Sequence, residues 1–298
     1  GFVFSTKLGN VTTLRYVNFG FNYHKAKSFN RTMTMGGQYS LSQTDLMASQ
    51  ANQMYGAGMD LHQLTENNIL PYDQDRVGWL GALGWDARLF ETDDDPKNNV
   101  RNNAVNPNNP YYSLGISPYA TYKSVERGGV DQYDFNIAFN FNDRFYFGVT
   151  IGAYDVNYRK SYFYGEDMKE GNDYSISSEN RINGAGWDAK FGFILRPMED
   201  SPLRLGLAIH TPTFYKLTYT TRAAIQSNIW YVNNETGEEF QEHLSYDTYY
   251  ELNDKDMKSE FELRTPWTYN LSIGYTVGSN LALGAEYEYQ DYSKMAFY

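Results

Sequence analysis

Three things are missing from this sequence of 298 residues: cysteine, long apolar runs and an excess of positive charge. The absence of cysteine excludes a disulfide framework and a thiolate metal site. No run of about 18 apolar residues occurs, which excludes a membrane-spanning helix, and the longest apolar stretch, Val77 to Trp85, is too short. The chain has 25 Lys and Arg against 36 Asp and Glu, for a net charge of -11. Without a basic surface to neutralise phosphates, it is not expected to bind nucleic acid.

Aromatic residues are abundant instead. Phe, Trp and Tyr make up 17% of the chain, with 28 Tyr and 18 Phe, although the mean hydropathy of -0.62 is hydrophilic. Aromatic strands joined by polar loops reconcile these two observations. The composition therefore argues against an ordinary soluble domain.

The stretch from Arg264 to Tyr298 contains two alternating segments around one turn. The first segment places these apolar residues on one face: Trp267, Tyr269, Leu271, Ile273, Tyr275 and Val277. The second places these there: Leu281, Leu283, Ala285, Tyr287 and Tyr289. Small and polar residues alternate with them, and Gly278-Ser279-Asn280 supplies the positive φ that a tight reversal needs. The pattern predicts a hairpin with one apolar and one polar face.

Aromatic side chains mark the ends of these segments, Trp267 and Tyr269 on the first and Tyr287 and Tyr289 on the second. Girdles of this kind occur where a barrel strand meets the membrane interface. Each segment also has about the 9 to 11 residues that a tilted strand needs to cross a bilayer. We therefore expect an all-β fold, a transmembrane antiparallel β-barrel.

The same alternation recurs along the chain and predicts about eight barrel strands. The other expected strands are 2–8, 12–24, 132–141, 145–164, about 187–195, and 203–209, the last continuing through Tyr215, Leu217 and Tyr219. After Gln132, odd-numbered apolar residues are expected to face lipid, and their even-numbered neighbours a watery interior. Examples of the lipid-facing set are Phe135, Ile151, Leu205 and Ile273.

Two long polar stretches, at about 25–129 and 226–258, interrupt this pattern. In the first, Ser42 to Asp45 resembles a helix-capping box, and helices are expected after it, around Leu61, and from about Asp75 to Phe90. The reversal at 165–174 is also longer, whereas those at Gly9-Asn10, Asn142-Asp143, Met198 to Ser201 and Gly278 to Asn280 are short. Because outer-membrane barrels have short periplasmic turns and long outer loops, both stretches are expected outside, as insertions into a single barrel domain, 1–298. Both chain ends then also lie outside, so strands are expected to be missing at each end.

Several phrases in the strand regions carry a family resemblance. They are Tyr16 to Tyr23 leading to Phe29-Asn30-Arg31, Pro202 to Pro212, Thr265-Pro266-Trp267, Ala285 to Tyr289, and Asp291-Tyr292-Ser293. Together they resemble the FadL/TodX family of outer-membrane transporters for long-chain fatty acids and other hydrophobic compounds. The resemblance covers most strand regions and little of the loops.

This resemblance implies a fourteen-stranded barrel in the outer membrane of a Gram-negative bacterium, with an N-terminal segment folded inside as a hatch. The chain resembles the middle of such a protein, because the hatch, a first strand and several C-terminal strands have no counterpart here. The resemblance also implies passage of a hydrophobic molecule by diffusion, without a cofactor or ATP.

The first candidate site is an apolar set around the third predicted helix. Its members are Trp79, Leu80, Leu83, Trp85, Leu89 and Phe90. In the family, apolar outer loops collect ligand before it enters the barrel, which implies a binding role for this set. The alternative is that these residues only pack the insertion against the barrel mouth, as apolar residues at helical spacing usually do.

The second candidate site is a polar row expected to line the lumen. Its members are Arg196, Arg204, His210, Asn270, Glu286, Glu288 and Gln290. A cation there could pair with a carboxylate headgroup, because charges attract more strongly beside a low-dielectric wall than in water. The alternatives are exposure at the rim and internal Arg–Glu pairs that brace the barrel.

Pro212, in His210-Thr211-Pro212, marks a third place of interest. Proline has no N–H to donate, so it predicts a bulge or kink in the strand. In the family a kinked strand opens a lateral exit through the wall. The sequence leaves open whether this one does.

Catalysis has little support. The four histidines, at 24, 62, 210 and 243, share no metal-ligand spacing, and no G-x-S-x-G motif occurs. We expect no metal site and no enzyme activity, with an outer-membrane lipid hydrolase as the weaker alternative.

The sequence therefore predicts an outer-membrane barrel that binds hydrophobic molecules such as long-chain fatty acids at its outer loops and passes them inward. Its expected partners are such a molecule or lipid and the lipid of the membrane itself. The alternative from a different class is a barrel of the same fold that acts as a structural or docking partner for surface or secreted proteins.

Overall fold

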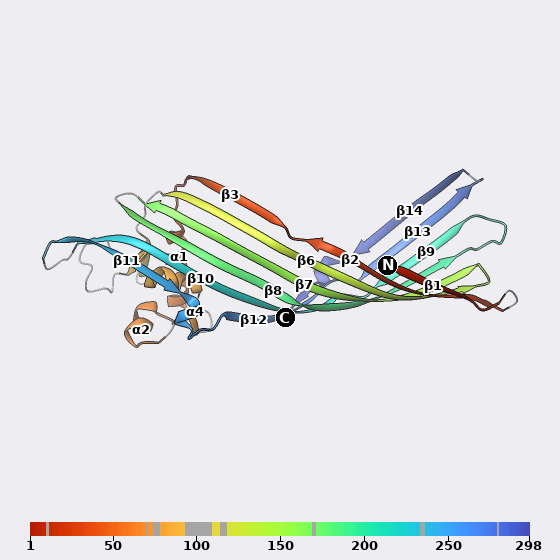
Figure 1. Cartoon of the computed structure of the whole chain (residues 1–298), viewed down its shortest axis with the longest axis horizontal. Coiled ribbons are helices and arrows are strands. Elements are labelled where there is room, and N and C mark those ends of the chain that lie inside the picture. Colours follow the sequence, from red (N-terminus) through yellow and green to blue (C-terminus); the bar gives the residue numbers. More distant parts are fainter. Residues whose placement is uncertain are drawn as a thin grey trace.

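The computed structural model describes residues 1–9, 12–69, 71–73, 78–92, 109–113, 118–168, 171–232, 236–278 and 280–298. One large antiparallel sheet dominates them, with a group of helices at one end (Figure 1). Within these ranges, no helix has both the length and the apolar character needed to cross a membrane.

The large sheet has 13 strands. They are β1 (Phe2–Lys7), β2 (Leu14–Ser28), β3 (Arg31–Gln38), β6 (Tyr119–Phe141), β7 (Phe145–Met168), β8 (Asn172–Leu195), β9 (Arg204–His210), β10 (Phe214–Val232), β11 (Glu239–Asp247), β12 (Met257–Arg264), β13 (Thr268–Val277), β14 (Leu281–Gln290) and β15 (Ala296–Phe297). The remaining elements are α1 (Gln43–Gly56), α2 (Leu61–Glu66), η1 (Pro71–Asp73), α3 (Trp79–Asp86), α4 (Thr248–Glu251), η2 (Tyr292–Lys294), and the two-stranded sheet of β4 (Phe90–Thr92) and β5 (Tyr111–Ser113).

Three strands, β6, β7 and β8, run the whole length of the sheet and join two different ends. At the hairpin end the strand order is β1-β2-β6-β7-β8-β9-β13-β14, so parts of all eight predicted strands lie side by side there. At the helical end the neighbours change to β3 on one side and β10 on the other, with β11 and β12 beyond β10. The strands cross between the ends in Figure 1, as the right-handed twist of long strands requires.

The predicted hairpins are present, and described turn residues adopt the conformations that tight reversals need. In the C-terminal hairpin Tyr269 lies opposite Tyr289, and Gly278 has a φ of 59°. The reversal between β6 and β7 uses Asn142 and Asp143 at φ of 51° and 54°. Asn and Asp tolerate this left-handed conformation better than other non-glycine residues, so these turns follow directly from local sequence.

The predicted limits of the two insertions are too wide. β2 continues to Ser28, β3 reaches Gln38 and β6 begins at Tyr119, so the first insertion lies between residues 38 and 119. Strands also occupy most of 226–258, where β10 and β11 pair as a hairpin. These strand extensions carry polar residues on the face that no helix covers, which hides the apolar alternation from a sequence pattern.

Two predicted helices are confirmed and the third is shorter than predicted. Ser42 and Asp45 form the predicted capping box of α1, and α2 begins at Leu61. α3 ends at Asp86, and Arg88 has a φ of 55°, so Phe90 lies in β4 instead of in the helix. The predicted start near residue 75 lies outside the described ranges.

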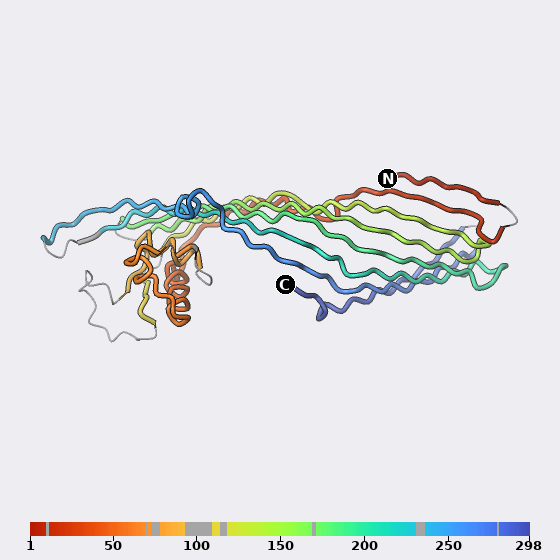
Figure 2. The backbone as a smooth tube through the Cα atoms, turned by 90° about the horizontal axis from the view of Figure 1, so that it is seen from below, coloured from red at the N-terminus to blue at the C-terminus, as the bar shows by residue number. Residues whose placement is uncertain are grey.

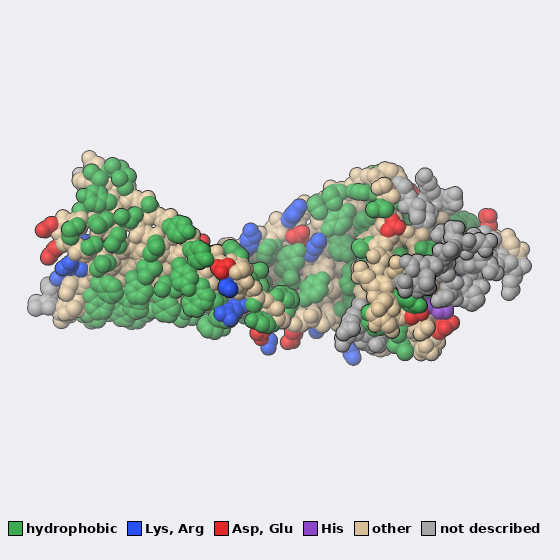
Figure 3. Space-filling model, turned by 180° about the vertical axis from the view of Figure 1, so that it is seen from behind, with side chains coloured by type: hydrophobic (Ala, Val, Ile, Leu, Met, Phe, Trp, Pro, Cys, Tyr) green, Lys and Arg blue, Asp and Glu red, His purple; other side chains and the backbone are tan. Residues whose placement is uncertain are grey.

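One face of the hairpin end is apolar and exposed, and we call it the apolar face. Its exposed fractions include 56% for Phe135, 48% for Ile151, 40% for Leu205 and 50% for Ile273. Apolar side chains cover this end of the molecule in Figure 3 (left). These residues therefore do not form a dry protein core, which would have excluded a membrane barrel.

The opposite face of the hairpin end, which we call the polar face, continues along β6, β7 and β8 into the helix-covered face of the helical end. Helices α1, α2 and α3 lie on one side of the sheet (Figure 2). Together with that sheet face they enclose a core of Met47, Ala48, Ala51, Met54, Leu61, Leu80, Ala82, Leu83, Ala87, Leu89, Phe90, Tyr111, Met168, Tyr174, Ile176, Ala223, Ile225 and Ile229. Packing of the helices thus buries most of the buried apolar residues in the described part of the chain.

A buried carboxylate fixes the first helix to the sheet. Glu166 in β7 accepts hydrogen bonds from the Ser42 hydroxyl and, at 2.7 Å, from the Gln43 backbone N–H. Both donors lie at the N-terminus of α1, where free N–H groups and the helix dipole favour a negative charge. This contact sets α1 over the helical end of the sheet.

The sheet is open among the described strands, because β1 pairs only with β2 and β14 only with β13. A large antiparallel sheet is therefore observed, whereas closure into a barrel is not.

Candidate functional site on the polar face

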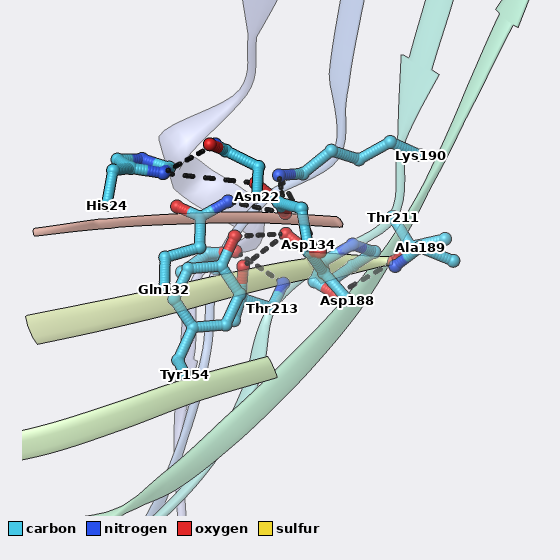
Figure 4. A network of polar contacts seen from close by, with 12 residues as sticks. Asn22, His24, Gln132, Asp134, Tyr154, Asp188, Ala189, Lys190, Thr211 and Thr213 are labelled. Carbon is cyan, nitrogen blue, oxygen red and sulfur yellow. Dashed lines mark hydrogen bonds and ion pairs between the residues drawn. The ribbon is translucent and has the colours of Figure 1, made fainter. Parts of the chain in front are cut away.

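The register of the long strands brings two aspartates together around a glycine. Asp134 in β6 lies opposite Gly152 in β7, which in turn lies opposite Asp188 in β8. A Cβ on Gly152 would clash with Oδ1 of Asp188, so only glycine leaves room for this carboxylate. The two aspartates are the centre of a network of polar contacts (Figure 4).

Asp188 is 3% exposed, and its two carboxylate oxygens differ. Oδ2 accepts hydrogen bonds from the hydroxyls of Tyr154 at 2.7 Å and Thr213 at 3.3 Å. Oδ1 accepts none within the described part of the chain and lies 4.0 Å from Nζ of Lys190. A buried carboxylate oxygen without a hydrogen bond costs free energy, so Asp188 is short of one donor.

Asp134 accepts hydrogen bonds from two further side chains of the network. Its Oδ1 accepts hydrogen bonds from Nε2 of Gln132 at 2.8 Å and from Nζ of Lys190 at 3.2 Å. Its Oδ2 lies 3.9 Å from Nδ1 of His24, which is 3.3 Å from Nδ2 of Asn22. Lys190 therefore joins β6 to β8 across β7, and two carboxylates share its charge.

The strand break predicted at Pro212 is confirmed, and a second break lies beside it. β9 stops at His210 and β10 starts at Phe214, while β12 and β13 are separated by residues 265–267. The Thr213 N–H donates to Oγ1 of Thr265 at 2.7 Å, and the Thr265 N–H donates to the Thr213 carbonyl at 3.1 Å. These two hydrogen bonds connect the break between β9 and β10 to the break between β12 and β13. The lateral exit that the family resemblance implies stays a prediction.

The break also exchanges the two faces of the strand. Ile209 in β9 lies opposite Phe191 on the apolar face, but Leu217 in β10 lies opposite Gly184 on the helix-covered face and is 6% exposed. The odd-numbered rule is therefore wrong for Tyr215, Leu217 and Tyr219. The cause is that His210 and Phe214 pair with Lys190 and Trp187, so the connecting residues shift the register by one.

Part of the predicted lumen row adjoins this network. His210 lies opposite both Lys190 and Thr268. Gln290 lies opposite Thr268 and donates to its hydroxyl at 2.9 Å. These contacts extend the polar face from β8 to β14.

The rest of the row lies closer to the short turns. Asn270 is opposite Glu288, and Glu286 is two residues further along β14. Arg204 is opposite Gly274 near the turn end. Arg196 follows the last residue of β8 and donates to the Asp143 carbonyl at 3.2 Å. Its guanidinium is therefore bound to the turn between β6 and β7.

The predicted ligand patch lies mostly inside the helical end. Leu83 and Leu89 are fully buried, and Leu80 and Phe90 nearly so. Trp79 and Trp85 are partly exposed and pack against the same core. This burial favours the packing alternative, and a ligand role for the patch stays a prediction.

Sequence analysis did not select Asp134, Gln132 or Tyr154 as site residues. Gln132 and Asp134 lie on β6 and Tyr154 lies on β7, and only the register of β6, β7 and β8 brings them near Asp188. One signal was available: Gly152 and the even-numbered polar residues around it interrupt strands whose odd-numbered positions are apolar.

The chemistry available at the site is hydrogen bonding and charge. Among the residues that the structure describes, no group of three or more His, Cys, Asp or Glu could hold a metal ion. A hollow of about 670 Å³ on the apolar face is lined by Phe2, Phe4, Phe135 and Ile151 among others, and includes no network carboxylate. The polar face therefore offers hydrogen-bonding groups and carboxylates, and the hollow offers apolar surface.

Comparison with known proteins adds no relative: no family model, curated protein or solved structure matches the chain. The fold and the site define a protein built on an open antiparallel sheet, with an exposed apolar face and a hydrogen-bonded polar face.

Proposed function

We propose that the chain forms part of a transmembrane β-barrel of the Gram-negative outer membrane that passes hydrophobic molecules, such as long-chain fatty acids, by diffusion. The observation that carries this proposal is the exposed apolar face at the hairpin end. Soluble proteins rarely expose a contiguous apolar area of more than a few hundred Å². A face of this kind, opposite a hydrogen-bonded polar one, suits lipid on one side and a lumen on the other.

The length of the apolar face along its strands agrees with the thickness of a bilayer's apolar core. It follows β6 from Tyr133 to Phe141, close to the roughly 9 to 11 residues that a tilted strand needs. The next residue on that face is Asp131, which accepts a hydrogen bond from the Tyr23 hydroxyl at 3.0 Å. Aromatic pairs lie near this boundary, with ring centroids 5.2 Å apart for Tyr23 and Tyr133 and 5.0 Å apart for Trp187 and Phe214.

In the proposed orientation the hairpin end, with its short turns, faces the periplasm, and the helical end lies outside the cell. The helices lie on the sheet face that becomes the polar face, so in this orientation they stand over the outer mouth of the lumen. A ligand would reach the polar network from the helical end and leave towards the short turns.

The test is uptake of a hydrophobic dye by cells that carry the full chain in their outer membrane. Gly192 lies on the polar face between Gly148 and Ala208, and a Cβ there meets nothing within 4 Å. Gly192→Trp is expected to narrow the lumen and lower uptake several-fold. Ala153→Trp, on the apolar face beside Trp187, is the control and should leave uptake unchanged. Equal uptake by both variants and the parent would contradict the proposal.

The docking alternative draws on one observation, the length of the helical end. β7 and β8 are 24 residues each, more than twice the length that crosses a bilayer, so a rigid sheet with helices would project outside. This alternative predicts that replacing 39–118 by a short linker abolishes capture of a surface protein while dye uptake persists.

A further inference from the structure

Four basic side chains line up across the strands at the helical end of the sheet. Arg127 in β6 lies opposite Arg159 in β7, which in turn lies opposite Arg181 in β8. Thr220 in β10 lies between Arg181 and Lys258 in β12. The four basic side chains are exposed, and we call them the cationic row. Because neighbouring strands lie about 4.8 Å apart, the row is about 19 Å long.

The cationic row carries more charge than its surroundings neutralise. Like charges directly opposite each other in a sheet repel. Glu179 forms ion pairs with Arg159 and Arg181, and it is the one carboxylate within ion-pair distance of the row in the described part of the chain. Arg127 donates to the Glu126 carbonyl at 3.0 Å, which neutralises no charge. Four cations and one carboxylate leave three positive charges here, in a chain whose net charge is -11.

The row continues the apolar face along the same strands. On β7 the apolar face ends at Ala153, opposite Trp187, and Asp155 and Asn157 separate it from Arg159. The six residues from Ala153 to Arg159 cover about 20 Å along the strand, or about 15 Å in height at the tilt of a barrel strand. In the proposed orientation the row therefore stands above the outer leaflet of the membrane.

This height decides which lipid the row can reach. The headgroup layer of a phospholipid bilayer is only about 5 to 7 Å deep on each side. The phosphates of an ordinary phospholipid therefore lie well below the row, whereas a lipid with a large phosphorylated saccharide carries anionic groups up to it. Arginine suits phosphate in particular, because its planar guanidinium donates two parallel hydrogen bonds to it.

From the aligned arginines, their incomplete neutralisation and their height above the apolar face, we infer that the cationic row binds the phosphate groups of an outer-leaflet glycolipid with a large phosphorylated saccharide headgroup. The inference rests on the proposed function, because it needs the apolar face to lie in the outer membrane. It adds a lipid partner that binds the outside of the wall, distinct from the molecule that passes through the lumen.

The test places the full chain in phosphatidylcholine vesicles that contain lipopolysaccharide with a phosphorylated core. Parallel vesicles contain the same lipopolysaccharide after chemical dephosphorylation, or phosphatidylglycerol, whose phosphate lies at the base of its headgroup. Native mass spectrometry of the protein released in mild detergent counts the lipids that stay bound. Intact lipopolysaccharide should be retained roughly tenfold better than the other two, and inorganic phosphate in the buffer should not displace it.

Two variants test whether the row is the cause. Arg127→Gln with Arg159→Gln keeps the pair of Arg181 and Glu179, so folding should persist. It should lower retention of lipopolysaccharide about fivefold, the effect of two exposed charged contacts. Glu179→Gln should raise retention about threefold, because Arg159 and Arg181 lose the carboxylate that competes for them. If these arginines only brace the sheet through Glu179, this variant does not raise retention and the inference is wrong.

A matched control separates the row from the net charge. Lys7→Gln with Arg144→Gln, near the short turns at either end of the first hairpins, removes the same number of positive charges. This variant should retain lipopolysaccharide as the parent does. An equal loss in both double variants would overturn the inference.

The remaining outcomes separate the inference from the proposed function. If the folded chain floats with none of the vesicles in a density gradient, the proposed function is overturned. If it floats with them but retains all three lipids alike, or if inorganic phosphate displaces the lipopolysaccharide, the inference alone is overturned. A dimer that is lost in the arginine variant would assign the row to a second copy of the chain and would also overturn the inference.

Discussion

The two ends of one sheet arrange their side chains in opposite ways. At the hairpin end apolar residues such as Ile151 are exposed, and on the other face polar residues such as Asp188 are buried and hydrogen-bonded. At the helical end apolar residues such as Ile176 are buried beneath helices, while Arg159 and Arg181 on the other face are exposed and pair with Glu179. Ile151 and Arg159 lie on the same face of the same strand.

This comparison shows that β7 changes surroundings partway along its length. The strand keeps one register with β8 from Phe145 to Met168, so its backbone is uniform. In our proposal, what changes is the medium on each side: helices replace an aqueous lumen on one face, water replaces lipid on the other, and the aromatic pairs mark the boundary.

The largest expected effect concerns the core of the helical end. Leu83 is fully buried, so Leu83→Ala should destabilise the helical end by about 2 to 5 kcal/mol through the cavity it leaves. Hydrogen exchange should show faster opening of α1 and α3, with β9, β13 and β14 unaffected. Leu46→Ala, in α1 but 50% exposed, is the control and should cost under about 0.5 kcal/mol. Loss of protection at both ends would show that they are one cooperative unit.

The next prediction distinguishes positions on β7 that face lipid in our proposal from positions that face water. Ile151→Lys should cost about 2 to 4 kcal/mol if the residue faces the middle of a bilayer. Ser161→Lys, on the same face beyond the boundary, should stay within about 0.5 kcal/mol because it faces water. Urea unfolding of the chain in lipid vesicles measures both. Similar costs at the two positions would remove the distinction between the ends.

A smaller effect is expected in the polar network. Gly152→Ala forces Asp188 away from its place and strains its bond to Tyr154, which should cost about 1 to 3 kcal/mol. Gly192→Ala, where a Cβ meets nothing, provides the control in the neighbouring strand. Thermal unfolding compares the two. If Gly152→Ala does not lower the stability, Asp188 can move aside at no cost in free energy, and the prediction is wrong.

The smallest effect is a pH dependence confined to the helical end. Burial raises the pKa of Asp86 to about 6, although a hydrogen bond from the Tyr72 hydroxyl opposes the shift. Because the folded chain holds this proton more tightly than the unfolded one, the stabilisation is full below about pH 4 and is lost as the pH rises through about 6. The helical end should be about 1 to 2 kcal/mol more stable at pH 5 than at pH 8. Hydrogen exchange corrected for intrinsic rates should show this in α3, and Asp86→Asn should abolish it.

Sequence analysis predicted the hairpins, the capping box at Ser42 and the break at Pro212, because each follows from a few neighbouring residues. It placed the first insertion too broadly, since β3 and the start of β6 carry no apolar stripe on their exposed face. It also missed Asp134 and Tyr154, which reach Asp188 only through the pairing of three strands.

The sequence by itself determined which residues alternate and where the chain reverses, since period-two patterning and turn chemistry are local properties. Only the tertiary structure decided what each face meets. Leu83 and Ile225 are far apart in the chain, yet they share one core, and a shift of one residue between His210 and Phe214 moves Leu217 from the apolar face to the covered one. The physical reason is that burial depends on which segments pack together, and a strand's own pattern does not specify its partners.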